Sequence, residues 1–154
     1  MNLKVLFVLS LIVLLGLFLR FYQLDRVPPS LGWDEASTMW NAYTFEKTGT
    51  DEYARPFPLV SIRSFNDFKP PMYVYLTSVV FAIFGVSVWA VRFVSAASAV
   101  VAIAVTYFLT NELFGKRRIA LMAALFLAVS PWHLPFSRVA FEYTLALTLF
   151  MLGN

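Results

Sequence analysis

Two adjacent acidic residues, Asp34 and Glu35, lie between two tryptophans in the segment LGWDEASTMWNAY. A carboxylate beside an acceptor hydroxyl can act as a general base, and carboxylate oxygens also bind metal ions. Asp34 falls at the predicted start of a helix, where the helix dipole favours the ionised form of an acid. Capping of this helix is an alternative role for Asp34. Because a cap does not account for Glu35, we predict that both acids are catalytic.

Basic side chains supply the complementary charges for such a site. Lys69, Arg92 and Arg138 are predicted to bind a donor phosphate and to neutralise the charge on a departing phosphate group. The alternative is that they reach lipid headgroups from helix ends, as we expect for Arg20. Glu142 follows Arg138 by four residues, so it is either a second-loop acid of the same site or an intrahelical partner of Arg138.

The composition indicates which elements must position these residues. The chain has 154 residues, of which 60% are hydrophobic and 14% charged, whereas soluble domains are about half apolar and about a quarter charged. A multi-pass membrane protein is therefore expected. The net charge of +3 is spread over several loops, so nucleic acid is not an expected partner. The lone His133 is expected to be a hydrogen-bonded structural residue.

The charges between the apolar segments decide the topology. The basic cluster 116–118 is predicted to be cytoplasmic. It would lie outside if residues 72–91 crossed the membrane fully, but Gly85 and Ser87 interrupt that segment and leave less than the ~20 residues that a span needs. We therefore expect a helix at the outer interface there, although a full crossing is the alternative. The first apolar segment has a cleaved signal peptide as its alternative.

The predicted fold is an all-α polytopic membrane domain whose first outer loop carries two interface helices. The candidate site residues then all lie at the outer face. The last span is cut off by the chain end, which indicates the N-terminal part of a longer protein. The expected segments are a first span at about 4–22, interface helices at about 35–47 and 71–84, spans at about 92–113 and 119–137, and a truncated span from about 143.

The ordered segments resemble the N-terminal part of the GT-C glycosyltransferases. They are an apolar helix, WDEA, KPPMYVYLTSVVFAIFG, WAVRFVSAASAVVAIAVTY and LFGKRRIALMAALFLAVSPWHLPFSR. The branch they resemble is the protein mannosyltransferase and aminoarabinose transferase-like group, also called the dolichyl-phosphate-mannose-protein mannosyltransferase-like family. The resemblance implies a multi-spanning enzyme that moves a sugar, with inversion, from a polyprenyl-phosphate carrier to an acceptor at the extracytoplasmic face.

The resemblance also implies roles for individual residues. Asp34 corresponds to the acid that acts as a base or binds a metal or the acceptor, with Glu35 beside it. Lys69 and Arg92 correspond to phosphate contacts. Relatives often carry an Asp about five residues after the second-loop arginine, where Tyr143 stands in this chain, so the sequence departs from the family pattern at Glu142.

The sequence thus predicts a membrane glycosyltransferase, or its N-terminal part, in a bacterial or archaeal plasma membrane. Its expected partners are a polyprenyl-phosphate sugar donor, membrane lipid, and an acceptor that is a lipid, a protein or a glycan. The sequence does not decide whether a divalent metal ion is also required. The alternative is a non-catalytic membrane subunit or transporter fragment that uses the same charges to bind lipid headgroups.

Overall fold

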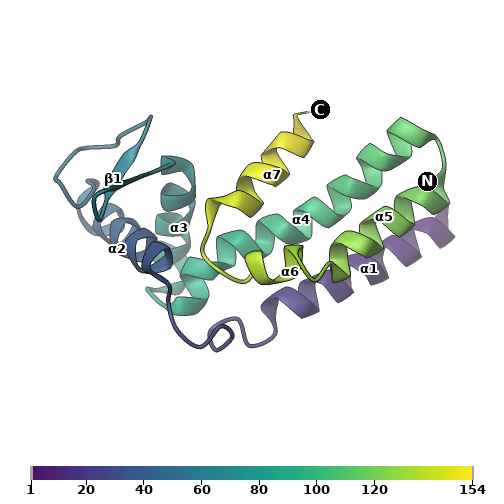
Figure 1. Ribbon diagram of the computed structural model, residues 1–154, viewed down its shortest axis with the longest axis horizontal. Coiled ribbons are helices and arrows are strands. Elements are labelled where there is room, and N and C mark those ends of the chain that lie inside the picture. The colour runs from purple at the N-terminus through teal and green to yellow at the C-terminus, as the bar shows by residue number, and fades with distance from the viewer. Residues whose placement is uncertain (1, 154) are drawn as a thin grey trace.

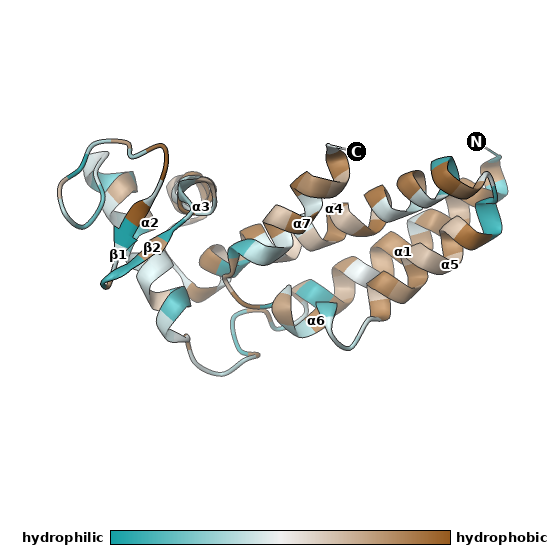
Figure 2. Ribbon diagram, turned by 45° about the horizontal axis from the view of Figure 1, so that its top comes forward, coloured by the Kyte–Doolittle hydropathy of each residue, from teal (hydrophilic) through white to brown (hydrophobic). Residues whose placement is uncertain are grey.

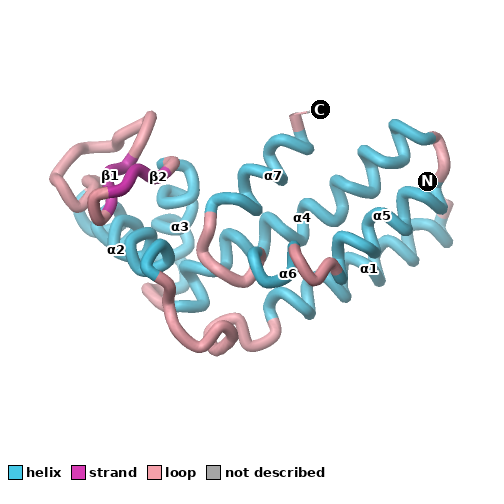
Figure 3. Tube along the Cα trace, in the orientation of Figure 1, coloured by secondary structure: helices cyan, strands magenta, loops and turns pink. Residues whose placement is uncertain are grey.

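The computed structural model describes residues 2–153, which form helices and one hairpin of two short strands (Figures 1 and 3). The predicted all-α class is confirmed, and the hairpin is an element that the sequence did not predict. The elements are α1 (Leu3–Phe21), α2 (Trp33–Thr48), β1 (Ile62–Ser64), β2 (Asp67–Lys69), α3 (Pro71–Phe84), α4 (Val88–Phe114), α5 (Arg117–Val129), α6 (His133–Phe136) and α7 (Glu142–Leu152).

Helices α1, α4 and α5 pack along one another and, with α7 beside α4, form what we call the bundle. Residues 22–87, which include α2, the hairpin and α3, form the head at the end of the bundle opposite the N-terminus (Figure 1). Within residues 2–153, α1 and α4 are the helices long and apolar enough to cross a membrane. The 27 residues of α4 extend about 40 Å, which exceeds the ~30 Å hydrocarbon core of a bilayer.

Small side chains allow the bundle helices to approach closely. Ala120, Ala124 and Ala128 recur every fourth residue on α5 and are fully buried against α1 and α4. On α1, a Cβ at Gly16 would lie 2.3 Å from Cδ1 of Ile103 on α4, so a larger residue there would force the end of the Ile103 side chain to move. Small residues are typical of helix interfaces in membranes, where lipid competes for apolar surface. The large apolar side chains of α1 mostly point away from these contacts and are exposed.

The predicted span 119–137 is divided in the structure. Helix α5 ends at Val129, because Ser130 precedes Pro131 and takes an extended ψ of 121°. The side chain of Arg20 donates to the carbonyl oxygens of Leu127 and Ala128, 3.2 and 3.1 Å away. These carbonyls belong to the last turn of the helix, where the intrahelical hydrogen bonds run out.

Arg20 is fully buried, which corrects the expectation that it reaches lipid headgroups. Its second terminal nitrogen lies 2.9 Å from Nδ1 of His133. Because arginine can only donate, Nδ1 of His133 accepts this hydrogen bond. The two residues join the end of α1 to α6, and His133 is hydrogen-bonded as the sequence predicted.

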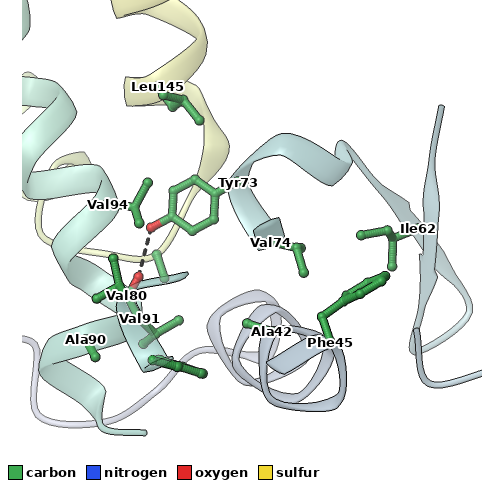
Figure 4. Close-up of a cluster of buried hydrophobic side chains, with 12 residues drawn as sticks. Ala42, Phe45, Ile62, Tyr73, Val74, Val80, Ala90, Val91, Val94 and Leu145 are labelled. Carbon is green, nitrogen blue, oxygen red and sulfur yellow. Dashed lines mark hydrogen bonds between the residues drawn. The ribbon is translucent and has the colours of Figure 1, made fainter. Parts of the chain in front are cut away.

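The head has its own apolar core, shown in Figure 4. Tyr73 of α3 points toward Val94 of α4, and its hydroxyl donates to the carbonyl oxygen of Val91 at 3.0 Å. On the other side of α3, Val74 packs toward Phe45 of α2 and Ile62 of β1. Helix α3 therefore holds the head together and also fixes it to the bundle.

The hairpin is closed by a two-residue turn. Ser64 pairs with Asp67, and the intervening Phe65 and Asn66 both have positive φ, 48° and 67°. Positive φ at both central residues is the conformation of a type I′ turn, whose twist matches paired strands. The buried amide of Asn41 on α2 donates to the hydroxyl of Ser64 at 2.8 Å, so the hairpin is attached to α2.

Candidate functional site

Asp34 and Lys69 form an ion pair at the surface of the head. Gly32 is the N-cap of α2, and Asp34 lies in the first turn. Its carboxylate therefore faces Lys69 instead of capping the helix, and the cap-only alternative is wrong. The side chain of Asp34 is 39% exposed, whereas that of Lys69 is 11% exposed. One carboxylate of the acidic pair is thus accessible to other molecules.

Lys69 remains charged through its acidic neighbours. Its amine also lies 3.3 Å from the carboxylate of Asp67, two residues earlier on the same face of β2. Burial alone would lower the pKa of Lys69, but the hydrogen bonds with Asp34 and Asp67 and the negative charge of Glu142 outweigh burial, so the pKa is raised. These side chains bring opposite charges together beside β2, which carries hydrophilic colour in the ribbon of Figure 2.

Glu35 is buried directly behind this surface, with 2% of its area exposed. Its Oε1 accepts from Nε of Arg92 at 2.9 Å and from the backbone N–H of Ala140 at 2.8 Å. Its Oε2 accepts from a terminal nitrogen of Arg92 at 3.1 Å and from the backbone N–H of Gly32 at 3.1 Å. A carboxylate has about four lone-pair positions, and each of them has a donor.

Arg92 is fully buried, and the protein satisfies its whole guanidinium. Besides its two hydrogen bonds to Glu35, it donates to the carbonyl oxygens of Leu24, Pro28 and Ser30 at 3.0, 2.9 and 3.1 Å. These contacts use all five N–H groups of an arginine. They also fix the connection between α1 and α2, which forms no helix or strand of its own.

Arg138 lies at the end of α1. One terminal nitrogen donates to the carbonyl oxygens of Leu19 and Arg20, and the other donates to those of Tyr22, Gln23 and Val27, at 2.6 to 3.3 Å. A cation there satisfies carbonyl groups that a helix C-terminus leaves free. Burial lowers the pKa of Arg138, and the charge of Arg92 lowers it further.

Glu142 is the first residue of α7 and is half-buried. Its charge acts on Lys69, which places it near the Asp34–Lys69 pair. Within residues 2–153 it forms no ion pair with Arg138, so the predicted intrahelical pair is absent from the described part of the chain. The structure therefore groups Asp34, Lys69 and Glu142 at the surface, places Glu35 and Arg92 beneath them, and holds Arg138 at α1.

Sequence reasoning missed two members of this network. Asp67 lies two residues before Lys69 and shares its face of β2, but a strand of three residues gives too short a pattern to be recognised in the sequence. No sequence signal marks the backbone N–H of Ala140, since every residue except proline carries such a group.

The described residues do not provide a metal centre. Within residues 2–153 no group of three or more His, Asp or Glu side chains is placed to hold a metal ion. Asp34, which the family resemblance gives as a base or as a contact to a metal or the acceptor, is paired with the cation of Lys69.

The surface pair has the two charges that group transfer from a phosphate requires. An ionised carboxylate can accept the proton of an attacking hydroxyl, and an adjacent ammonium can neutralise a departing phosphate. The charges of Glu35 and Arg92 cancel in the interior, so Asp34 and Lys69 are the members of this predicted set that lie at the surface.

Comparison with known protein families is consistent with this chemistry. The family model described as dolichyl-phosphate-mannose-protein mannosyltransferase matches residues 68–153, which is more than half of the chain. The matched range includes Lys69, Arg92, Arg138 and Glu142 and begins after Asp34 and Glu35. No curated protein and no solved structure matches the chain.

Proposed function

The chain belongs to the dolichyl-phosphate-mannose-protein mannosyltransferase family of membrane glycosyltransferases, and on that premise we propose the reaction, the residues and the membrane face. The reaction is transfer of a sugar from a polyprenyl-phosphate carrier to a hydroxyl of an acceptor. It takes place at the extracytoplasmic face of a multi-pass domain in the cell membrane. The observation that carries this proposal is the partly exposed carboxylate of Asp34 held against Lys69.

Asp34 is the general base of the proposed reaction. It accepts the proton of the acceptor hydroxyl while the hydroxyl oxygen attacks the anomeric carbon of the sugar. The bond between that carbon and the phosphate oxygen breaks, and the polyprenyl phosphate leaves with the bonding electrons. A single displacement of this kind inverts the anomeric centre.

Lys69 binds the phosphate of the donor. In the absence of substrate its ammonium is shared between Asp34 and Asp67. A bound phosphate competes for this ammonium, which releases one oxygen of Asp34 to face the acceptor hydroxyl. The negative charge of Glu142 helps to keep Lys69 protonated. Lys69 then stabilises the charge that accumulates on the leaving phosphate.

We assign Glu35 and Arg92 a positioning role, in place of the direct catalytic and phosphate contacts that the sequence suggested. Every donor and acceptor of the two side chains is engaged by the protein. Their ion pair holds the first turn of α2 against α4, and so it holds Asp34. Arg138 receives a positioning role for the same reason, because its terminal nitrogens are engaged by carbonyl groups at the end of α1 and in the following loop.

The base assignment is tested with Asp34→Asn in the full-length protein. Purified protein in liposomes is given synthetic polyprenyl-phosphate mannose, glucose and aminoarabinose, with envelope extract as acceptor. Loss of a general base is expected to lower kcat by about 10²–10⁴-fold. The matched control is Asp67→Asn, which removes the other partner of Lys69 and should leave most of the activity. Transfer at the wild-type rate by a normally expressed Asp34→Asn protein would favour the non-catalytic alternative.

The membrane face is tested with single cysteines, because the natural chain has none. Asn66→Cys in the hairpin turn should react in intact cells with an impermeant thiol reagent. Arg117→Cys in the basic turn between α4 and α5 should react only after the membrane is opened. Labelling of Arg117→Cys in intact cells would place the head on the cytoplasmic side and would overturn the proposed sidedness.

A further inference from the structure

An exposed aromatic pair lies beside the reactive carboxylate. Trp33 is the first residue of α2, directly before Asp34, and 71% of its surface is exposed. Its ring contacts that of Phe65 edge-on, with centroids 5.2 Å apart and planes at 69°. An edge-on contact leaves most of the indole face open.

Phe65 is held firmly enough to orient Trp33. It occupies the type I′ turn of the hairpin, and its backbone N–H donates to the side chain of Glu52 at 2.7 Å. The same hairpin places Lys69 against Asp34. The charged pair and the aromatic pair are thus two contacts between the same hairpin and the same turn of α2.

The surroundings of Trp33 differ from the surfaces of the head that suit lipid. Its neighbours in the turn and on β2 include the exposed Asn66 and Asp67, in addition to the Asp34–Lys69 pair. Lipid-like surface occurs on α3, where large apolar side chains are exposed at helical spacing: Met72, Leu76, Val79 and Ile83. Aromatic rings mixed with charged groups fit a ligand that has both apolar C–H faces and hydroxyl groups.

A pyranose ring has this dual character. Its axial C–H groups form an apolar face that suits the electron-rich face of an indole, and its hydroxyl groups project around the rim. Trp33 and Asp34 both contact the hairpin, through Phe65 and Lys69, so the rim of a ring stacked on the indole lies on the side of α2 that also carries Asp34. A flexible alkyl chain or a peptide hydroxyl would gain less from a rigid aromatic plane at this position.

We propose that Trp33, oriented by Phe65, forms an acceptor subsite and that the acceptor is a carbohydrate, whose ring stacks on the indole while one of its hydroxyls faces Asp34. This inference rests on the proposed function and names the acceptor class that it leaves open. Trp33 is a specificity-determining residue in this account, and Asp34 remains the base.

The first experiment measures transfer by the full-length protein with mannan oligosaccharide, chitohexaose, a serine-rich peptide and a long-chain alcohol as acceptors. Trp33→Ala should raise the KM for the preferred oligosaccharide on the order of 10-fold and leave the KM for the polyprenyl-phosphate donor unchanged. Trp33→Phe, which keeps an aromatic face, should stay within about threefold of wild type. The control is Trp40→Ala, two turns further along α2, which should change neither constant.

Three results would overturn the subsite. They are an unchanged oligosaccharide KM in Trp33→Ala, an equal rise in the donor KM, and a preference of the wild-type enzyme for the peptide or the alcohol. Because Trp33 is exposed, Trp33→Ala should fold normally. If Trp33→Ala fails to fold, the test rests on Trp33→Phe, which is expected to fold and to retain oligosaccharide binding.

A second experiment separates this inference from the proposed reaction. Oligosaccharide binding is measured by isothermal titration calorimetry in the Asp34→Asn protein and in the double variant that also carries Trp33→Ala. Saturable binding in the first and its loss in the second would support the subsite even if transfer by wild type is never observed. Equal binding in both would overturn the subsite while leaving the catalytic assignment of Asp34 intact.

Discussion

Neighbouring helices of the bundle meet through alanines and a glycine, whereas the junction between the head and the bundle encloses an ion pair whose donors and acceptors are all engaged. In a bilayer, lipid tails are as apolar as the helices, so close packing of small side chains drives association. At the junction, the polar groups of α2, α4 and the α6–α7 connection must satisfy one another because they are buried. The contacts between α1, α4 and α5 are therefore specified mainly by shape, and the junction by polar complementarity.

The same contrast separates two adjacent residues. Asp34 and Glu35 point to different environments although one peptide bond joins them. The carboxylate of Glu35 is buried and both of its oxygens accept hydrogen bonds. The carboxylate of Asp34 has the side chain of Lys69 as its partner and is partly exposed to solvent. The accessible carboxylate stands on a backbone that the buried acid helps to fix.

The largest effect is expected from removing the polar centre of the head. Glu35→Ala leaves the guanidinium of Arg92 buried without its counter-ion, which should cost about 3–5 kcal/mol of unfolding free energy. Denaturant unfolding of the detergent-solubilised protein, followed by tryptophan fluorescence, measures this loss. Glu35→Gln should destabilise nearly as much because it also removes the charge.

The matched control for this prediction is Glu46→Gln. Glu46 pairs with the exposed Lys47 at 2.9 Å, so its removal should leave the unfolding curve unchanged. A Glu35→Ala protein as stable as this control would mean that the Glu35–Arg92 pair does not specify the head.

A smaller effect is expected from adding one methyl group to the bundle. Gly16→Ala places a Cβ 2.3 Å from Cδ1 of Ile103, which should destabilise the α1–α4 contact by about 1–3 kcal/mol. Ile103→Val removes that Cδ1 atom, so the double variant should be more stable than the sum of the two changes predicts. Strict additivity would show that the two sites do not share this contact.

The smallest effect concerns the surface pair and depends on pH. The pKa of Lys69 is raised in the folded protein, so its pairing stabilises the head fully below the ordinary lysine value of about 10.4. This contribution is lost as the pH rises through the raised folded value. The thermal midpoint of wild type should therefore fall slightly more between pH 9 and about 12 than that of Lys69→Met. If the thermal midpoints of wild type and Lys69→Met changed in parallel with pH, the pairing of Lys69 would not contribute to the stability of the head.

The fold was predictable where a short stretch of sequence decides the structure. Pro70 and Pro71 at one end and Gly85 at the other bound α3, and the helix runs over the range predicted for it, 71–84. Pro131 would have revealed the break after α5 by the same reasoning. The hairpin has three-residue strands, which are too short for an alternating pattern to be recognised.

The site was predictable as a set of charges but not as a set of contacts. The sequence identifies Asp34, Glu35, Lys69 and Arg92 as charged residues in an apolar chain. It does not indicate which acid is buried, because that depends on backbone groups of distant segments. Carbonyl oxygens before α2 complete the shell of Arg92, and an N–H after α6 completes that of Glu35.

The hydrogen bond from Ala140 to Glu35 joins residues 105 positions apart and sets an order of events during synthesis. Arg92 can reach Glu35 once α4 has been made, 57 residues after the acid. The last acceptor position of Glu35 stays open until Ala140 emerges, which at about 5–20 residues per second takes several seconds more. During this interval the first loop of the nascent chain already has its charge balanced but lacks its final restraint.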